Sequence, residues 1–128
     1  MLIDQAFLDG LSAQARAAGR LRKVFDLGAP EDGCQRVLNA IEPGSVIAVH
    51  RHRETAELMV ALRGRLVVDL FDDGGAPAGS FELTPGGVAP AVSVPAGIWH
   101  TVRSLESGSV LLAVKEGPWA PLGEEDVK

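Results

Sequence analysis

The segment Gly44–Gly64 reads Gly-Ser-Val-Ile-Ala-Val-His-Arg-His-Arg-Glu-Thr-Ala-Glu-Leu-Met-Val-Ala-Leu-Arg-Gly. His50 and His52 lie two residues apart in it, and residues two apart on a strand point to the same face of a sheet. Two imidazoles on one face can converge on one ion, at metal–nitrogen distances of about 2.0–2.1 Å. A tight reversal around residues 53–56 can bring Glu57, on the next strand, beside them. This spacing predicts a metal site on a β-sheet.

The third histidine of the chain, His100, ends a second short segment, Pro-Ala-Gly-Ile-Trp-His. A sheet that closes into a barrel can place this residue opposite the first two imidazoles. Three neutral nitrogens and one carboxylate suit a divalent first-row metal, and the sequence does not distinguish between Fe, Mn, Ni and Zn. The predicted ligands of one such ion per chain are His50, His52, Glu57 and His100. Glu54 is an alternative carboxylate, because it shares the parity of the first two histidines on an unbroken strand.

Short runs rich in Val, Leu and Ile alternate with turn clusters around these segments, and the chain contains 15 Gly and 8 Pro. Many short strands at such spacing predict an all-β sandwich or barrel. The predicted strands are Cys34–Ile41, Val46–Arg51, Glu57–Arg63, Arg65–Phe71, Ser80–Leu83, Ala91–Val94, His100–Leu105 and Val110–Lys115. On the second of them we expect Val46 and Ala48 to face inward with the histidines, and Ile47 and Val49 to face outward.

A helix is predicted before the first strand, from about Asp4 to Ala18, because apolar residues recur there at steps of three and four. This apolar face consists of Ile3, Phe7, Leu11, Ala15 and Ala18. Asp4 can cap the start of the helix and Gly19 can end it. We expect the helix to pack outside the barrel. The prediction is a single domain, 1–128, divided into helix and connector (1–30), barrel (31–117) and irregular tail (118–128).

Composition narrows the possible partners and locations of the chain. Of its 128 residues 46% are hydrophobic and 23% charged, and the net charge is −5. An acidic chain suits nucleic acid poorly, and the one basic cluster, Arg20, Arg22 and Lys23, is expected to be a solvated helix end. Cys34 is the only cysteine, which excludes an intrachain disulfide and a Cys-based zinc site. Without a leader pattern or an apolar run of roughly 20 residues, we expect a cytoplasmic protein that binds no membrane.

The two histidine segments resemble the two sequence motifs of the cupin proteins. In the first motif, Gly, His-x-His, Glu and Gly occur at fixed spacing, and these positions hold Gly44, His50, His52, Glu57 and Gly64. The second motif, Pro-x-Gly-x-x-His, is filled by Pro95, Gly97 and His100. The resemblance implies a cupin double-stranded β-helix, or jelly-roll barrel, with a metal held by the four ligands named above.

A narrower resemblance, to the WbuC-type cupin metalloproteins of bacteria, covers almost the whole chain and includes the helix before the barrel. It rests on Gln35–Ala40, Pro43–Gly44, His50–His52, Arg63–Arg65, Phe71–Asp73, Pro95–Thr101 and Val114–Pro118. Some of these relatives are encoded near genes for surface-polysaccharide synthesis, so the resemblance implies a link to that process. It implies a bound metal but no particular reaction.

Four further residues are candidates for substrate binding. The WbuC resemblance favours Arg36, which could hold a carboxylate or phosphate, Asn39, which could hydrogen-bond a polar ligand, and Lys115. Arg36 and Asn39 lie three residues apart, so on a regular strand at most one of them points into the barrel. Trp99 is the fourth candidate, because it precedes His100 and could line the cavity.

The expected ligand set determines which functions are possible. Four protein ligands on a six-coordinate ion leave two positions open for water, dioxygen or a chelating substrate. One expectation is therefore a metalloenzyme of the isomerase, epimerase or dioxygenase type that acts on a small polar metabolite such as a sugar or nucleotide-sugar. The alternatives are a non-catalytic module that binds or senses such a ligand, and a closed structural zinc site. Apolar residues on both faces of the strands also predict a homodimer.

Overall fold

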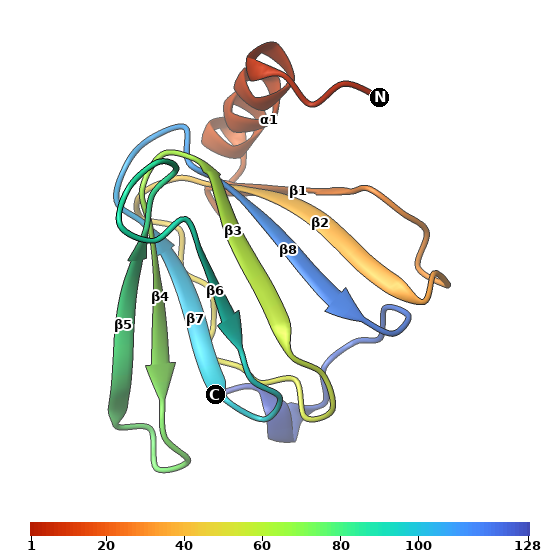
Figure 1. Cartoon of the computed structure of the whole chain (residues 1–128), viewed down its shortest axis with the longest axis vertical. Coiled ribbons are helices and arrows are strands. Elements are labelled where there is room, and N and C mark those ends of the chain that lie inside the picture. Colours follow the sequence, from red (N-terminus) through yellow and green to blue (C-terminus); the bar gives the residue numbers. More distant parts are fainter.

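The computed structural model describes all residues, 1–128, and shows two antiparallel β-sheets with a helix packed against them (Figure 1). The strands are β1 Arg22–Asp26, β2 Cys34–Ile41, β3 Glu57–Arg63, β4 Leu66–Phe71, β5 Pro77–Leu83, β6 Ala91–Val94, β7 Trp99–Ser104 and β8 Val110–Glu116. The helices are α1 Gln5–Ala17 and a 3₁₀ turn, η1 Glu124–Asp126. The predicted all-β architecture with a preceding helix is confirmed.

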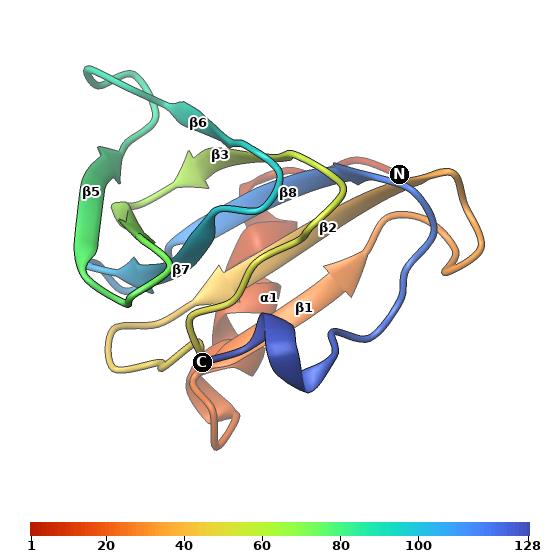
Figure 2. The same cartoon turned by 90° about the horizontal axis from the view of Figure 1, so that it is seen from below.

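The larger sheet has the strand order β1-β2-β8-β3-β6, and the smaller one has the order β5-β4-β7. The two sheets enclose a common interior, which is seen from below in Figure 2. Their buried apolar side chains form one core cluster of Ile41, Met59, Ala61, Leu66, Val68, Leu83, Val94, Val102 and Leu111. Strand β8 pairs with both β2 and β3, so residues far apart in the sequence lie side by side on the inner face of the larger sheet.

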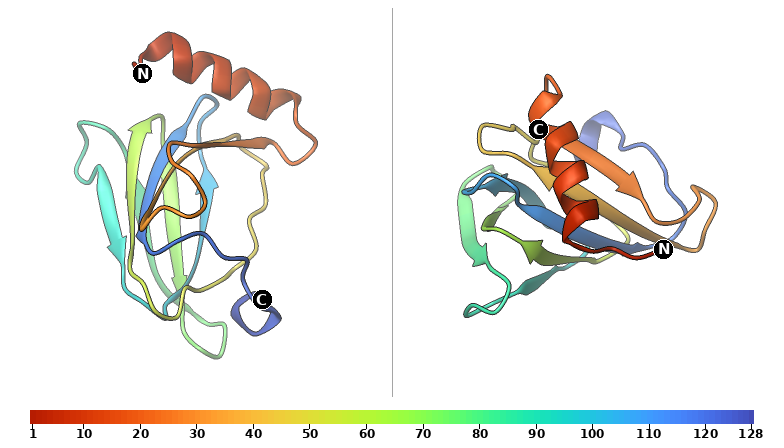
Figure 3. Two further views of the ribbon diagram at one scale, coloured as in Figure 1. Left: turned by 90° about the vertical axis from the view of Figure 1, so that its right-hand side faces the viewer. Right: turned by 90° about the horizontal axis from the view of Figure 1, so that it is seen from above.

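Helix α1 lies on the outer side of the larger sheet (Figure 3). Asp4 caps it, because a carboxylate oxygen accepts a hydrogen bond from the backbone nitrogen of Phe7 at 2.9 Å. The second apolar cluster joins helix and sheet through Leu8, Leu11, Ala15, Leu38, Ala40 and Val110. The helix thus covers apolar sheet surface that would otherwise face water, as the sequence predicts. No helix of the structure has the length and apolar character needed to cross a membrane.

The predicted strand Val46–Arg51 does not form. His50 alone makes isolated bridges, to His100 and to Val127. The facing is also reversed, because Val46 is 82% exposed and Ile47 packs against the core. The physical reason is that this backbone has scattered partners and no strand ladder. Arg22 Nη1 donates to the Val46 carbonyl at 2.9 Å and Thr101 Oγ1 to the Ile47 carbonyl at 2.5 Å, and the rest pairs with His100 and with the tail.

Strand β1 was not predicted, since the residues before Pro30 were assigned to the helix and a connector. It is an edge strand that pairs only with β2, and most of its side chains are exposed, so it lacks the apolar alternation that would reveal it. The basic cluster is therefore not simply a solvated helix end, because Arg22 and Lys23 begin this strand. The tail is irregular as expected, apart from η1 and the bridge at Val127.

The turn between β3 and β4 explains why a glycine is required at position 64. Gly64 has φ +82°, in the left-handed region that favours glycine. An added Cβ would also lie 2.7 Å from the Cα of Ser109, which belongs to the loop before β8. Ser109 is itself fixed, because its hydroxyl accepts a hydrogen bond from the backbone nitrogen of Arg65 at 3.1 Å and donates one to the carbonyl of Glu106 at 2.7 Å.

We predict that Gly64→Ala lowers the free energy of unfolding by about 3 kcal/mol or more, because a left-handed backbone conformation and a backbone overlap act together. The matched control is Gly86→Ala: Gly86 has φ +71° but no atom within 4 Å of an added Cβ. That variant should lose only about 1–2 kcal/mol. Urea unfolding measures both values, and equal losses would show that the contact with Ser109 is unimportant.

Candidate metal centre

Three histidines and one glutamate meet inside the fold, although they come from three separate segments of the chain. His50 and His52 lie in the connection between β2 and β3, Glu57 is the first residue of β3, and His100 lies on β7. One ligand atom of each residue lies within 4.8 Å of those of the other three. The ring centroids of His50 and His100 are 4.4 Å apart, and that of His52 lies 5.1 and 5.5 Å from them. The four residues named from the spacing are thus brought together.

Backbone hydrogen bonds hold two of the imidazoles in place. The backbone nitrogen of His50 donates to the carbonyl of His100 at 3.0 Å, and that of His100 donates to the carbonyl of His50 at 2.8 Å. In addition, His50 Nδ1 lies 2.9 Å from the Ala48 carbonyl, and His100 Nδ1 lies 2.8 Å from the Ile98 carbonyl. A carbonyl can only accept, so each Nδ1 carries the proton and each Nε2 is left for the cluster.

Glu57 is the anionic member of the cluster and is buried. Its Oε1 lies 3.0 Å from His100 Nε2 and 3.5 Å from His52 Nε2. Burial by itself would raise the pKa of Glu57, but His100 and His52 together hold this pKa well below its usual range. Burial also lowers the pKa of His50, which favours its neutral form. The cluster therefore offers a carboxylate and a neutral imidazole, which are the forms that bind metals.

The donor set fits a divalent cation. His100 Nδ1 donates to the Ile98 carbonyl, so Nε2 is the atom that faces a carboxylate oxygen of Glu57 3.0 Å away. Two acceptors repel each other unless a proton or a metal ion lies between them. His52 Nε2 is also buried without a hydrogen-bond partner. The four ligand atoms lie within 4.8 Å of one another, which is close to the span of about 4.2 Å across one ion with bonds of about 2.1 Å.

The alternative carboxylate, Glu54, is exposed and does not belong to the cluster. The reversal of the chain thus comes before residue 57, at residues 53–56 as the sequence analysis assumed. Glu57 then points inward because its strand begins there and its parity matches that of the buried residues Met59 and Ala61.

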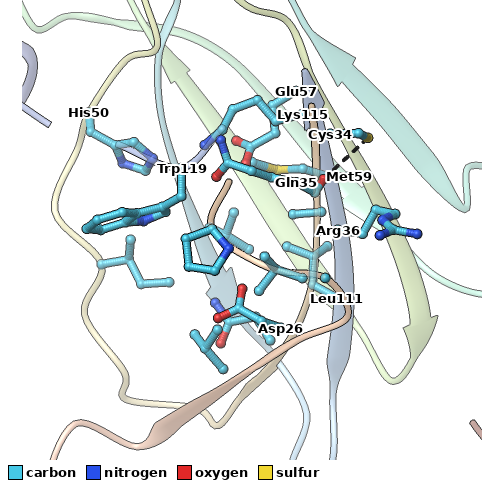
Figure 4. A pocket seen from close by; sticks show the side chains of 18 of the residues that line it. Asp26, Cys34, Gln35, Arg36, His50, Glu57, Met59, Leu111, Lys115 and Trp119 are labelled. Atoms are coloured by element: carbon cyan, nitrogen blue, oxygen red, sulfur yellow. Dashed lines mark hydrogen bonds between the residues drawn. The ribbon is translucent and has the colours of Figure 1, made fainter. Parts of the chain in front are cut away.

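A cavity of about 500 Å³ adjoins the cluster, and Glu57 and His50 form part of its wall (Figure 4). The remaining wall comes mainly from one face of the larger sheet, through alternate residues of four strands. These residues are Val24 and Asp26 on β1, Gln35, Val37 and Asn39 on β2, Met59 on β3, and Leu111, Ala113 and Lys115 on β8. Cavities of this size hold small-molecule ligands, and here the ligand would lie against two of the four candidate metal ligands, His50 and Glu57.

The four predicted substrate-binding residues lie in different places. Asn39 and Lys115 line the cavity from the inner face of the sheet. Arg36 has the opposite parity and reaches only the rim of the cavity, where its half-exposed side chain lies 3.6 Å from Asp32. Trp99 is buried outside this cavity, with its indole nitrogen donating to Asp73 at 3.3 Å.

The tryptophan that lines the cavity is Trp119, which the sequence analysis did not select. Its backbone nitrogen donates to the Pro30 carbonyl at 2.9 Å, which fixes the tail against the loop before β2. Gln35, also missed, donates from Nε2 to the carbonyls of Gly117 and Pro118 at 3.2 and 3.1 Å. A parity count from Asn39 would have found Gln35, whereas nothing in the pattern of the tail indicates Trp119.

The tail also supports the segment that carries the first two histidines. Asp126 accepts hydrogen bonds from Arg51 Nε at 2.9 Å and from Arg53 Nε at 2.6 Å. The backbone nitrogen of Arg51 donates to the Asp126 carbonyl at 3.0 Å, and that of Lys128 donates to the Val49 carbonyl at 2.8 Å. The histidine segment is thus held between β7 on one side and the tail on the other.

We predict that Asp126→Ala weakens metal binding by about 10-fold, because both arginines that flank His52 lose their anchor. Competition against a chromophoric chelator measures the affinity. The control is Glu82→Ala, which removes an equally close ion pair, 2.6 Å to Arg65, away from the cluster. If both variants bind metal as tightly as the unmodified chain, the tail does not position the ligands.

The lowered pKa of Glu57 predicts how the stability of the metal-free protein changes with pH. Because the pKa of Glu57 is lower in the fold than in the unfolded chain, the folded state binds fewer protons and its stability falls as the pH drops below about 4.3. Glu57→Gln removes this group and should flatten that part of the profile. Urea midpoints measured between pH 7 and pH 3 test this prediction, and an unchanged acid slope in the variant would contradict it.

Comparison with known proteins places the chain in a family and a fold. Residues 3–83 match the profile of a family described as "Domain of unknown function (DUF6016)". No curated protein matches the sequence.

Solved structures with similar folds are numerous, and all those compared are under 25% identical in sequence. KdgF from Halomonas sp. has a TM-score of 0.61 at 18% identity, over 77% of this chain and 82% of that one. The capsular polysaccharide assembling protein CapF from Staphylococcus aureus has a TM-score of 0.68 at 15% identity, over 87% of this chain and 32% of CapF. Oxalate oxidase with the substrate analogue glycolate has a TM-score of 0.64 at 17% identity, over 83% of this chain and 55% of the enzyme.

These structures are cupins, so the predicted cupin fold is confirmed. This chain spans about a third of CapF and about half of oxalate oxidase. Likeness at this level of identity establishes the fold and carries no reaction with it. Membership of the WbuC type stays a prediction.

Proposed function

Because the chain belongs to the DUF6016 domain family and has the cupin fold, we propose that it is a divalent-metal cupin that acts on a small polar metabolite. The observation that carries this proposal is the convergence of three imidazoles and one carboxylate at the wall of a cavity of about 500 Å³. The WbuC resemblance suggests a sugar or nucleotide-sugar, linked to surface-polysaccharide synthesis, as the metabolite.

The ion would be held by His50, His52, Glu57 and His100. When bound, it supplies a Lewis acid that polarises a ligand oxygen or, as iron, a site for dioxygen. The chain itself contributes the fixed orientation of the imidazoles, through the carbonyls of Ala48 and Ile98, and the single negative charge of Glu57. The inner face of the larger sheet holds the ligand beside the ion.

The cavity favours a functional ion over a purely structural one. A closed structural site has its ligands buried in packed protein, whereas here His50 and Glu57 face a cavity of ligand size. Non-catalytic binding or sensing is the alternative function, and the small number of acid–base groups in the cavity favours it. The homodimer and the cytoplasmic location stay predictions.

We predict that the chain, purified without a metal-loaded resin, binds one divalent ion and that Glu57→Gln weakens this binding by more than about 100-fold. Glu54→Gln is the matched control, because it makes the same change on the exposed carboxylate three residues earlier. Elemental analysis and chelator competition with Fe, Mn, Ni and Zn give stoichiometry and affinity. Equal effects of the two substitutions, or no bound ion with any of these metals, would refute the metal centre.

The catalytic part of the proposal is tested on metal-loaded protein with a carbohydrate panel and an oxygen-uptake assay. Turnover is expected for the unmodified chain and for Glu54→Gln, and its loss is expected for His100→Ala with the circular dichroism spectrum retained. A ligand that raises the melting temperature without giving product would favour binding or sensing instead.

A further inference from the structure

Two polar groups in the cavity beside the metal centre have no partner in the protein. Lys115 makes no ion pair and no side-chain hydrogen bond, although it lines the cavity. The Asn39 side chain makes no hydrogen bond either, and its carboxamide oxygen is fully buried. Buried polar groups without partners cost free energy, so such groups in a cavity mark the places where a ligand binds.

Lys115 lies next to the metal-ligating carboxylate. In the sheet it pairs directly with Glu57 on β3 and with Gln35 on β2. Residues directly opposite each other on antiparallel strands have Cβ atoms about 4.5–5.5 Å apart. Figure 4 shows Lys115 and Glu57 together at one end of the cavity, with Asp26 at the other. Glu57 is already engaged with His100 and His52, so the Lys115 ammonium faces the cavity without an anion of its own.

The charges at this end of the cavity indicate which kind of ligand would bind there. A divalent ion and Glu57 together leave one positive charge, and the Lys115 ammonium adds a second beside it. Asp26, the other acidic residue of the wall, is exposed on the edge strand β1. An anion that binds at this end of the cavity therefore meets two cationic groups in a half-buried setting, where the attraction is stronger than in water. A carboxylate has two oxygens and can contact both at once.

Asn39 lies farther from the metal centre than Lys115 does, and its carboxamide suits an uncharged polar group of the ligand. It stands four residues from Gln35 on the same strand face, which corresponds to about 13 Å between their Cα atoms. The walls between these two levels are apolar, with Val37, Met59, Leu111 and Ala113. A hydroxyl group both donates and accepts, so it satisfies the carboxamide in either orientation. A fully hydroxylated body would leave several hydroxyls without partners on these apolar walls.

We propose that the ligand of this site is a small carboxylic acid that carries a hydroxyl group at a distance from the carboxylate. The carboxylate binds between the metal centre and Lys115, and the hydroxyl hydrogen-bonds to Asn39. This inference rests on the proposed function, because it uses the metal centre as one end of the site. It names a ligand class in place of the sugar that the WbuC resemblance suggests, because the apolar walls do not suit a fully hydroxylated molecule, and it names the two residues that select this class.

The test uses isothermal titration calorimetry on protein whose metal content has been measured. The probes are 6-hydroxyhexanoate, with hexanoate and 1,6-hexanediol as compounds that each lack one end group, and glucuronate with glucose as a sugar pair. The hydroxy acid should bind about 10-fold or more tightly than either matched compound. Glucuronate should likewise bind more tightly than glucose.

Two substitutions test which residue binds each end of the ligand. Lys115→Met removes the charge and keeps the length of the side chain, so it should weaken hydroxyhexanoate and hexanoate by about 10-fold or more and leave the diol unchanged. Asn39→Leu should weaken hydroxyhexanoate to the level of hexanoate. Lys23→Met is the control, because it makes the same change at an exposed lysine that does not line the cavity, and it should change nothing.

The possible results distinguish a wrong ligand class from a wrong metal centre. Measured metal at one ion per chain with equal binding of acid and neutral probes, or acid binding that survives Lys115→Met, overturns the ligand class and leaves the metal centre intact. A chain that binds no metal overturns the proposed function. Retained melting transitions in both variants ensure that lost binding reflects lost contacts and not unfolding.

Discussion

The site depends on one electrostatic constraint. Glu57 is a buried carboxylate, and two of the imidazoles around it, those of His50 and His100, already use Nδ1 in hydrogen bonds to the backbone. The carbonyls of Ala48 and Ile98 accept from Nδ1 of His50 and His100, so each Nε2 is left for the cluster, and that of His100 lies 3.0 Å from Glu57. An isolated buried carboxylate is costly, and a proton or a metal ion between it and the facing imidazole nitrogen offsets this cost. A divalent ion at the centre would do so for all four residues at once, and this is why the donor set fits a divalent metal.

The fold brings the four residues of the cluster together through hydrogen bonds between segments that are far apart in the sequence. Reciprocal backbone hydrogen bonds tie His50 to His100, which are far apart in the sequence, and the start of β3 places Glu57 under them. The remaining backbone around the first two histidines is satisfied by Arg22, Thr101 and the tail and not by a strand ladder. Because this segment lies apart from the sheet ladder, a cavity of ligand size lies between it and the inner face of the larger sheet.

Parity, spacing and the motif resemblance were enough to identify the four residues that cluster and most strand bounds. The four cluster residues could be found because His-x-His and alternating apolar residues have simple geometric consequences. The segment 46–51 forms no strand because its backbone pairs with the side chains of Arg22 and Thr101, with His100 and with the tail, contacts that no local pattern reveals. Strand β1 carries too few apolar residues to show its pairing, and Trp119 reaches the cavity only through tertiary contacts of the tail. Long-range contacts of single side chains therefore limit what could be inferred.

The same parity that gathers the metal ligands also places the uncompensated charge. Glu57 and Lys115 occupy opposite positions on neighbouring strands. Both point to the inner face, because Glu57 shares the parity of Met59 and Ala61 and Lys115 shares that of Leu111, which belong to the core between the sheets. An ion pair between these two side chains would be the simplest way to neutralise them, yet the carboxylate contacts His100 and His52 instead. Metal binding would use the remaining negative charge of Glu57 and leave the ammonium without an anion. The positive charge at this end of the cavity is thus neutralised only when an anionic group from outside the chain binds there.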